Sequence, residues 1–176
     1  MIVNLFDLEE KFTKKLPKDI EGYYSSGARD EITLKRNRTI FNEYELLPKL
    51  LRDVSSIDLK TSIFGIEYDL PFGIAPIGLQ GLMWPNSPEI LAKSAFNNNI
   101  PFILSTVSTS SIERISEITE GKFWFQLYHP AEDKLTNDLI IRTHASGCKV
   151  LVILCDVPTF GYRPKDIKNG LSMPPK

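Results

Sequence analysis

The chain has 176 residues, of which 42% are hydrophobic and 24% charged, and this composition is typical of a globular domain with a real core. Its formal net charge of -1 offers no basic field for nucleic acid or an anionic membrane, so we expect small-molecule or protein partners and no nucleic acid. The spacing of Cys148 and Cys155 argues against a metal site or a disulfide framework, and the longest apolar run, 150–155, is too short to cross a bilayer, which predicts a cytoplasmic protein.

The first sixty residues have the patterns of helices. Apolar residues at helical spacing predict a first helix within residues 5–12, and Pro17 opens a second short helix that ends near Gly27. The charged segment 29–46 predicts a third. We therefore expect residues 1–60 to form a helical segment that precedes the main domain.

From residue 61 onward, apolar and amphipathic segments alternate. The sequence TSIFGIEYDLP predicts a hairpin with its turn near Gly65. Four predicted strands follow, FGIAPIG (72–78), PFILSTV (101–107), FWFQLY (123–128) and KVLVILCDV (149–157), and the helical patterns between them cover residues 87–99, 110–119 and 133–147. Strands apolar enough for burial on both faces, alternating with helices, predict an α/β fold with a parallel sheet and right-handed crossovers.

Each predicted strand ends in small or polar residues: Gly78, Ser105 and Thr106, Gln126 and Tyr128, and Asp156. Ligands of parallel α/β folds bind at these carboxyl ends. Gln126 and Tyr128 are two places apart, so their side chains point to the same side of the strand. Either residue alone is equally well explained as a partner for loop backbone groups. Four strands that end alike favour a shared ligand site, although GLQGLM is not a dinucleotide-binding motif.

Five segments in chain order resemble the FMN-dependent 2-hydroxy acid oxidases and dehydrogenases, and they are most similar to the bacterial L-lactate and mandelate dehydrogenases. These segments are YYSSGARDEITLKRN (23–37), LPFGIAPIGLQGL (70–82), IPFILSTVSTSSIE (100–113), WFQLY (124–128) and DVPTFGYRPKDIKN (156–169). The resemblance implies the N-terminal half of a TIM (β/α)8 barrel with FMN at its C-terminal mouth. Residues 1–176 then form a single partial domain, in which residues 61–176 are the first four βα units and the barrel is truncated.

The resemblance also implies which residues contact the flavin. The backbone of Pro76, Ile77 and Gly78 is expected to lie along the isoalloxazine, where a small residue permits close approach. A turn at the end of a strand explains the same glycine. Ser105 and Gln126 match positions that hydrogen-bond the flavin ring. Leu154 stands where the family often has a threonine, which removes one such bond.

Substrate-binding roles follow from the same resemblance. Tyr23 and Tyr128 match phenols that contact the substrate carboxylate and hydroxyl, and Tyr128 is also expected to act in catalysis. Arg163 matches the guanidinium that binds the carboxylate with its planar fork, although a lone arginine in a polar loop is usually only solvated. Asp156 matches the carboxylate that orients the catalytic histidine of the family.

Other reactive side chains are not expected to take part. His129 should point away from the mouth, and His144 falls within a helical pattern, so both are interpreted as surface or packing residues. Cys155 is interpreted as a small core residue of a buried strand. No metal site is expected.

The function implied by the resemblance is FMN-dependent oxidation of an L-2-hydroxy acid, such as L-lactate, to the 2-oxo acid. The catalytic histidine and the phosphate-binding loops of the family are expected beyond Lys176, so the chain alone is not expected to be competent. One alternative is a non-catalytic half-barrel that pairs with a separate C-terminal half, and a second is a flavin or phosphate binder of another barrel family. A quinone or cytochrome electron acceptor, a peripheral position at the inner membrane and a homo-oligomer are further expectations.

Overall fold

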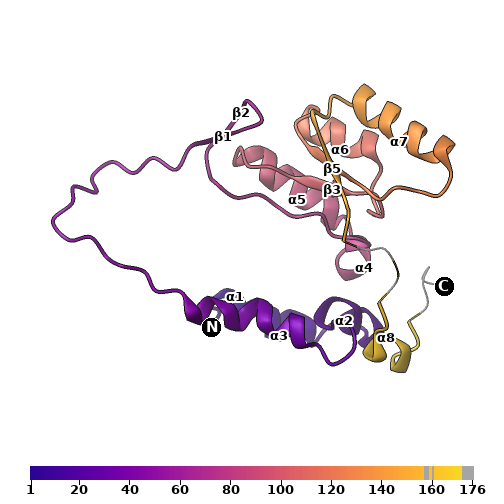
Figure 1. The fold of residues 1–176 in the computed structure, drawn as a ribbon, viewed down its shortest axis with the longest axis horizontal. Coiled ribbons are helices and arrows are strands. Elements are labelled where there is room, and N and C mark those ends of the chain that lie inside the picture. The colour runs from indigo at the N-terminus through magenta and orange to yellow at the C-terminus, as the bar shows by residue number, and fades with distance from the viewer. Residues whose placement is uncertain (157–158, 160, 172–176) are drawn as a thin grey trace. The chain divides into compact units, whose positions relative to one another are not determined.

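The computed structural model describes residues 1–156, 159 and 161–171 (Figure 1). These residues form two compact units. The first contains residues 1–53 and the described part of residues 159–176, and the second contains the described part of residues 54–158. The predicted division at residue 60 stays a prediction.

The first unit is helical. Its elements are α1 (Leu5–Thr13), α2 (Lys18–Ser25), α3 (Ile32–Thr39), the 3-10 helix η1 (Ile40–Glu43) and α8 (Pro164–Lys168). Helix α1 begins after Asn4, whose side chain accepts a hydrogen bond from the backbone N–H of Asp7 at 2.9 Å. Helix α2 packs against α8, where a Cβ on Gly22 would lie only 2.3 Å from Nδ2 of Asn169, so a larger residue would have to displace the Asn169 side chain. The first two predicted helices are confirmed.

The third predicted helix is shorter than expected. The sequence pattern covered residues 29–46, whereas α3 and η1 together run from Ile32 to Glu43, and residues 44–60 contain no helix or strand. No residue of α3 is buried. Because most helical stability in proteins comes from packing an apolar face, this charged segment has little to extend it.

The second unit begins with the predicted hairpin. Strands β1 (Thr61–Ile63) and β2 (Ile66–Tyr68) are antiparallel, and the turn residues Phe64 and Gly65 both have positive φ angles, 53° and 75°. Tyr68 Oη accepts a hydrogen bond of 2.8 Å from Nε1 of Trp124, and Trp124 is the first residue of the central sheet strand. The hairpin therefore lies at the amino end of the sheet.

A parallel sheet forms the centre of this unit. Strands β3 (Ile103–Ser105), β4 (Trp124–Leu127) and β5 (Val150–Ile153) are ordered β3-β4-β5. The connecting helices are the short α4 (Gln80–Met83), α5 (Ser87–Asn97), α6 (Ile112–Thr119) and α7 (Asp133–Ala145), and α6 packs beside both α5 and α7 (Figure 1). The predicted alternation of strands and helices is confirmed from residue 87 to residue 153.

The prediction of a regular strand at residues 72–78 was wrong. Only Ile74 pairs with β3, as its N–H donates to Pro101 O at 2.8 Å and its carbonyl accepts from Ile103 N at 3.1 Å. The next donor in a parallel ladder would be two residues further on, at Pro76, which has no N–H. The ladder therefore stops after one bridge.

Alternation along the strands separates two faces of the sheet. One face packs against the helices and forms the core, which contains Phe102, Leu104, Phe125, Leu127, Ala92, Ala95, Ile112 and Ile115. Ser105 and Gln126, which are partners in register, take the opposite face. At the β5 side the cover is incomplete, since Leu151 and Ile153 are 39% and 61% exposed. Cys155, just beyond β5, is also exposed, so its prediction as a core residue was wrong.

None of the helices in the described part of the chain combines the length and the apolar composition that a membrane crossing requires.

Candidate functional site

A buried serine and a buried glutamine lie side by side where β3 and β4 end. Ser105 and Gln126 are 5% and 2% exposed. Ser105 Oγ accepts from the N–H of Val107 at 3.3 Å and donates to Oε1 of Gln126 at 3.2 Å, which directs the amide oxygen toward the serine. Nε2 of Gln126 is buried without a hydrogen-bond partner among the described residues. Because such a donor is costly when unpaired, this position fits a ligand that presents acceptor atoms.

The segment from Pro76 to Gly78 is held against the same edge of the sheet. The N–H of Leu79 donates to Val107 O at 2.9 Å, and the N–H of Gly81 donates to Oγ1 of Thr109 at 3.0 Å. Pro76 and Gly78 are partly buried, whereas Ile77 is exposed. The structure thus brings the five residues predicted to contact a cofactor to the carboxyl ends of the strands.

Two predicted catalytic residues follow neighbouring strands at this same edge. Tyr128 comes directly after β4 and is 38% exposed, and its backbone N–H donates to Oγ1 of Thr106 at 3.0 Å. Asp156 follows β5 and is exposed. Their place at the strand ends agrees with the prediction, while their catalytic roles stay predictions.

The first unit contains the other predicted site residues. Tyr23 and Arg163 are 140 residues apart, yet Nη2 of Arg163 donates to the Tyr23 carbonyl and the guanidinium carbon lies 5.0 Å from the centre of the Tyr23 ring. The Tyr24 ring stands edge-on to that of Tyr23, with centroids 4.9 Å apart. Burial, and to a smaller extent the neighbouring Tyr23, raises the pKa of Tyr24 to about 12, so this phenol stays protonated at neutral pH. Of the two adjacent phenols, the structure pairs Tyr23 with the arginine.

Two residues that the sequence did not single out surround this arginine. Nε of Arg163 lies 2.7 Å from Oδ2 of the buried Asp166, and Nη2 lies 3.2 Å from Oγ of the buried Ser26. The three-residue spacing from Arg163 to Asp166 is that of a helical ion pair, and this signal was available in the sequence. Nε thus forms an ion pair with Asp166, although no hydrogen bond of regular geometry with any described residue, and Nη2 forms hydrogen bonds within the chain.

Both histidines are exposed. Nδ1 of His129 is 2.7 Å from the carbonyl oxygen of Pro130, and His144 lies on α7. Within the described ranges, no three His, Cys, Asp or Glu side chains are arranged to hold a metal ion.

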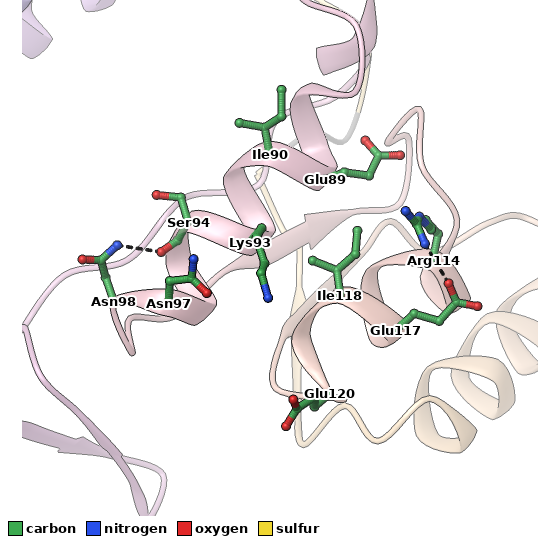
Figure 2. A pocket seen from close by; sticks show the side chains of 10 residues that line it. All are labelled: Glu89, Ile90, Lys93, Ser94, Asn97, Asn98, Arg114, Glu117, Ile118 and Glu120. Atoms are coloured by element: carbon green, nitrogen blue, oxygen red, sulfur yellow. Dashed lines mark hydrogen bonds and ion pairs between the residues drawn. The ribbon is translucent and has the colours of Figure 1, made fainter.

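A groove of about 700 Å³ lies between α5 and α6, and none of its lining residues belongs to a strand (Figure 2). Its side chains are Glu89, Ile90, Lys93, Ser94, Asn97, Asn98, Arg114, Glu117, Ile118 and Glu120. Arg114 forms an ion pair of 2.9 Å with Glu117, and Nδ2 of Asn98 donates to Ser94 O at 2.8 Å (Figure 2). The polar groups of these two contacts are therefore already paired, and the groove is open to solvent, so we do not assign the ligand site to it.

Comparison with known proteins identifies the family of the chain. Residues 12–176 match the protein family described as FMN-dependent dehydrogenase. Among curated relatives, (S)-mandelate dehydrogenase of Pseudomonas putida is 36% identical over 99% of this chain and 45% of its own length. L-lactate oxidase of Nostoc sp. is 39% identical over 98% of this chain and 48% of its own length. The chain therefore spans about half the length of these relatives.

Solved structures are also similar to the chain over about half of their own length. Mandelate oxidase with benzoyl-formic acid has a TM-score of 0.92 and 33% identity, and the match covers 98% of this chain and 51% of that one. A mutant of the active chimera of (S)-mandelate dehydrogenase also has a TM-score of 0.92, with 35% identity and coverage of 98% and 48%. The likeness confirms the predicted partial TIM (β/α)8 barrel. Both sequence and structure show that the chain belongs to the FMN-dependent dehydrogenase family.

Proposed function

We propose that residues 1–176 supply one wall of an FMN site and part of a substrate-carboxylate site in an enzyme that oxidises an L-2-hydroxy acid to the 2-oxo acid. The observation that carries this proposal is the buried, unpaired Nε2 of Gln126 at the carboxyl ends of the strands. FMN, when bound, supplies the acceptor for the two electrons removed from the substrate.

The residues at the strand ends fit the flavin ring. Its pyrimidine edge carries carbonyl oxygens, which are acceptors that match the two N–H groups on Nε2 of Gln126. Ser105 keeps the amide in this orientation through its bond to Oε1. The backbone of residues 76–78, which is held beside Val107, offers a surface for the ring. The side chain of Leu154 cannot donate a hydrogen bond, so the contacts from Ser105 and Gln126 become more important for holding the ring.

The remaining site residues bind and orient the substrate in this proposal. Arg163 and the Tyr23 phenol hold the carboxylate, and the Tyr128 hydroxyl contacts the substrate hydroxyl. Asp156 orients the histidine base expected of the family. An L-lactate-like substrate is proposed because LSTVS and GYRPKD resemble the lactate and mandelate dehydrogenases, and because L-lactate oxidase is among the relatives.

The proposal is tested by Gln126→Leu in the protein that carries this chain. We expect FMN to bind roughly 10- to 100-fold more weakly, because the variant loses two N–H donors at a cost of about 1.5 to 3 kcal/mol. Equilibrium dialysis with flavin absorbance measures the affinity. Asn98→Ala is the control, since it removes an amide at the end of α5 that bonds only Ser94 O in the described structure. Equal FMN affinity in Gln126→Leu and wild type would refute the proposal.

The alternative to this proposal is a half-barrel subunit that pairs with a separate C-terminal half. Within the described residues β5 pairs only with β4, and its residues Leu151 and Ile153 are exposed, so a carboxyl-terminal half would cover this edge in either arrangement. Light scattering of the purified protein, alone and mixed with the carboxyl-terminal half of a relative, tests this alternative. Binding of FMN only by the mixture would favour it.

A further inference from the structure

The hydrogen-bond ladder between β3 and β4 ends in an unusual way. Trp124 N donates to Phe102 O at 2.8 Å, and Thr106 N donates to Gln126 O at 3.0 Å. In a parallel ladder the next donor is Tyr128 N and the next acceptor is the Thr106 carbonyl. Tyr128 N instead donates to the Thr106 hydroxyl at 3.0 Å. The side chain of Thr106 thus takes the place of its own backbone carbonyl.

Because the Thr106 hydroxyl replaces the backbone carbonyl as acceptor, β3 can end while the backbone after β4 stays hydrogen-bonded at Tyr128. After Ser105 the chain turns, as Ser108 N donates to Ser105 O at 3.1 Å and Val107 N donates to Ser105 Oγ. The Thr106 hydroxyl also donates to Gln126 O at 2.5 Å. A hydroxyl has one donor and two acceptor positions, so both bonds form at once. One oxygen therefore ties the backbone of Gln126 and the backbone of Tyr128 together.

We propose that Thr106 is a positioning residue that holds the Gln126 amide and the Tyr128 phenol in register, and this inference rests on the proposed function. Gln126 O keeps a second donor, Thr106 N, when the hydroxyl is lost, whereas no other acceptor for Tyr128 N is found in the described residues. The loss of the hydroxyl therefore displaces Tyr128 more than Gln126. Turnover depends on this hydroxyl more strongly than FMN affinity does.

The test compares three variants in the protein that carries this chain. Thr106→Val keeps the shape of the side chain and loses both bonds, Thr106→Ser keeps the hydroxyl, and Thr119→Val is the matched control. Thr119 is buried in α6 and its hydroxyl donates to Ile115 O at 2.8 Å, so its loss is structural only. The measurements are hydrogen exchange at the Tyr128 amide, FMN affinity by dialysis, and turnover per bound FMN with L-lactate and L-mandelate.

In Thr106→Val we expect exchange at the Tyr128 amide to be about tenfold faster and turnover per bound FMN to be about tenfold lower, as expected for one lost hydrogen bond. FMN affinity should change by less than about threefold, and Thr106→Ser should restore both properties. Thr119→Val should lower the melting temperature and leave both properties unchanged. If Thr106→Val does not fold, Thr106→Ala is compared with Thr106→Ser instead.

Several results would overturn the inference. Unchanged exchange at Tyr128 in Thr106→Val would refute the ladder role, and faster exchange with unchanged turnover per bound FMN would refute the positioning role. Both outcomes leave the proposed function intact, because wild type still binds FMN and turns over. A wild-type protein that binds no FMN would refute the proposed function and the positioning role together, even where the exchange results agree with the ladder.

Discussion

The two groups of site residues differ in how far the chain itself satisfies them. At the strand ends, Ser105 fixes the Gln126 amide and leaves its Nε2 buried without a partner. In the first unit, Nε and Nη2 of Arg163 are already engaged with Asp166, Ser26 and the Tyr23 carbonyl. Among the described residues, the amide group has a donor with no partner, whereas the charge of the guanidinium is already paired with Asp166, although Nε makes no hydrogen bond of regular geometry.

Because of this difference, the two groups are expected to contribute differently to the stability of the protein and to ligand binding. An unpaired buried donor lowers the stability of the ligand-free protein and raises the gain when an acceptor arrives. A guanidinium with partners stabilises the helices that it joins and offers a ligand only its remaining N–H groups. Substitutions at Gln126 should therefore weaken binding with little change in stability, and substitutions at Arg163 should lower both.

The largest effect is expected for Arg163→Lys. Lysine keeps the charge but loses the contacts with Tyr23 O and Ser26 as well as the planar end that meets the substrate carboxylate. We expect kcat/KM to fall by roughly 10- to 100-fold, for about 1.5 to 3 kcal/mol, while FMN content changes little. Melting temperature should fall as well. Steady-state kinetics with flavin occupancy measured in parallel tests the prediction, and an unchanged kcat/KM would contradict the carboxylate role.

Tyr128→Phe is expected to act on turnover alone. The residue is exposed at the end of β4 and its backbone N–H still reaches Thr106, so the fold should not change. Turnover should fall about tenfold, for one lost hydroxyl bond of about 1.4 kcal/mol. Thermal melting and kinetics on one preparation distinguish this from a packing role, which would lower the melting temperature and leave specific activity unchanged.

Gln126→Leu tests the same comparison through the stability of the FMN-free protein. Gln126→Leu removes the unpaired Nε2 but also the Oε1 that accepts from Ser105, so the free energy of unfolding of the FMN-free protein should change by less than about 1 kcal/mol. Urea denaturation without FMN measures the change, with Thr119→Val as a buried polar control that should destabilise. A loss of more than about 1 kcal/mol in Gln126→Leu, beyond that of one hydrogen bond, would show that Nε2 has a partner in the ligand-free protein and would remove the contrast with Arg163.

The smallest effect concerns a paired group at the surface. Arg142 donates to both carboxylate oxygens of Glu113, at 2.8 and 3.0 Å, and lowers the pKa of Glu113 to about 2. Because the folded-state pKa is depressed, the pair stabilises the protein above the usual carboxyl range near 4.5, and this contribution disappears as pH falls toward 2. Both side chains are more than a third exposed, so we expect Glu113→Gln to cost less than about 1 kcal/mol at pH 7. Urea denaturation at pH 7 and pH 3 should show the difference shrinking, and an undiminished difference at pH 3 would exclude the ion pair as its cause.

Much of the second unit was predictable because its signals are local. The hairpin turn at Gly65 and the strand and helix periods after residue 87 follow from residue types alone. The predicted strand at 72–78 failed because hydrogen bonding depends on which residue of the ladder lacks an N–H, and register places Pro76 at that position. The length of α3 depends on tertiary packing, which a charged segment does not reveal.

The residues of the candidate site could be predicted from the sequence, but the hydrogen bonds and contacts between them could not. The polar strand ends indicated Ser105 and Gln126, but the direction of the amide depends on the turn at Val107. Thr106 was noted as a polar residue at a strand end, although nothing in the sequence shows that its hydroxyl replaces a backbone carbonyl. Tyr23 and Arg163 lie at opposite ends of the chain, and only the fold brings them into contact.

The bond between Trp124 and Tyr68 gives the protein an internal optical reporter. The chain has two tryptophans, and Trp124 starts β4 at the amino end of the sheet, with its indole N–H held by the Tyr68 phenol at 2.8 Å. Trp84 directly follows α4, the short helix after the segment that we place along the flavin. Within residues 1–176, a Trp84→Phe variant therefore leaves Trp124 as the tryptophan that emits, and a Trp124→Phe variant leaves Trp84. Emission from the first should follow the docking of the hairpin, and emission from the second should be quenched by flavin through energy transfer, so that opening at either end of the sheet can be observed separately in one protein.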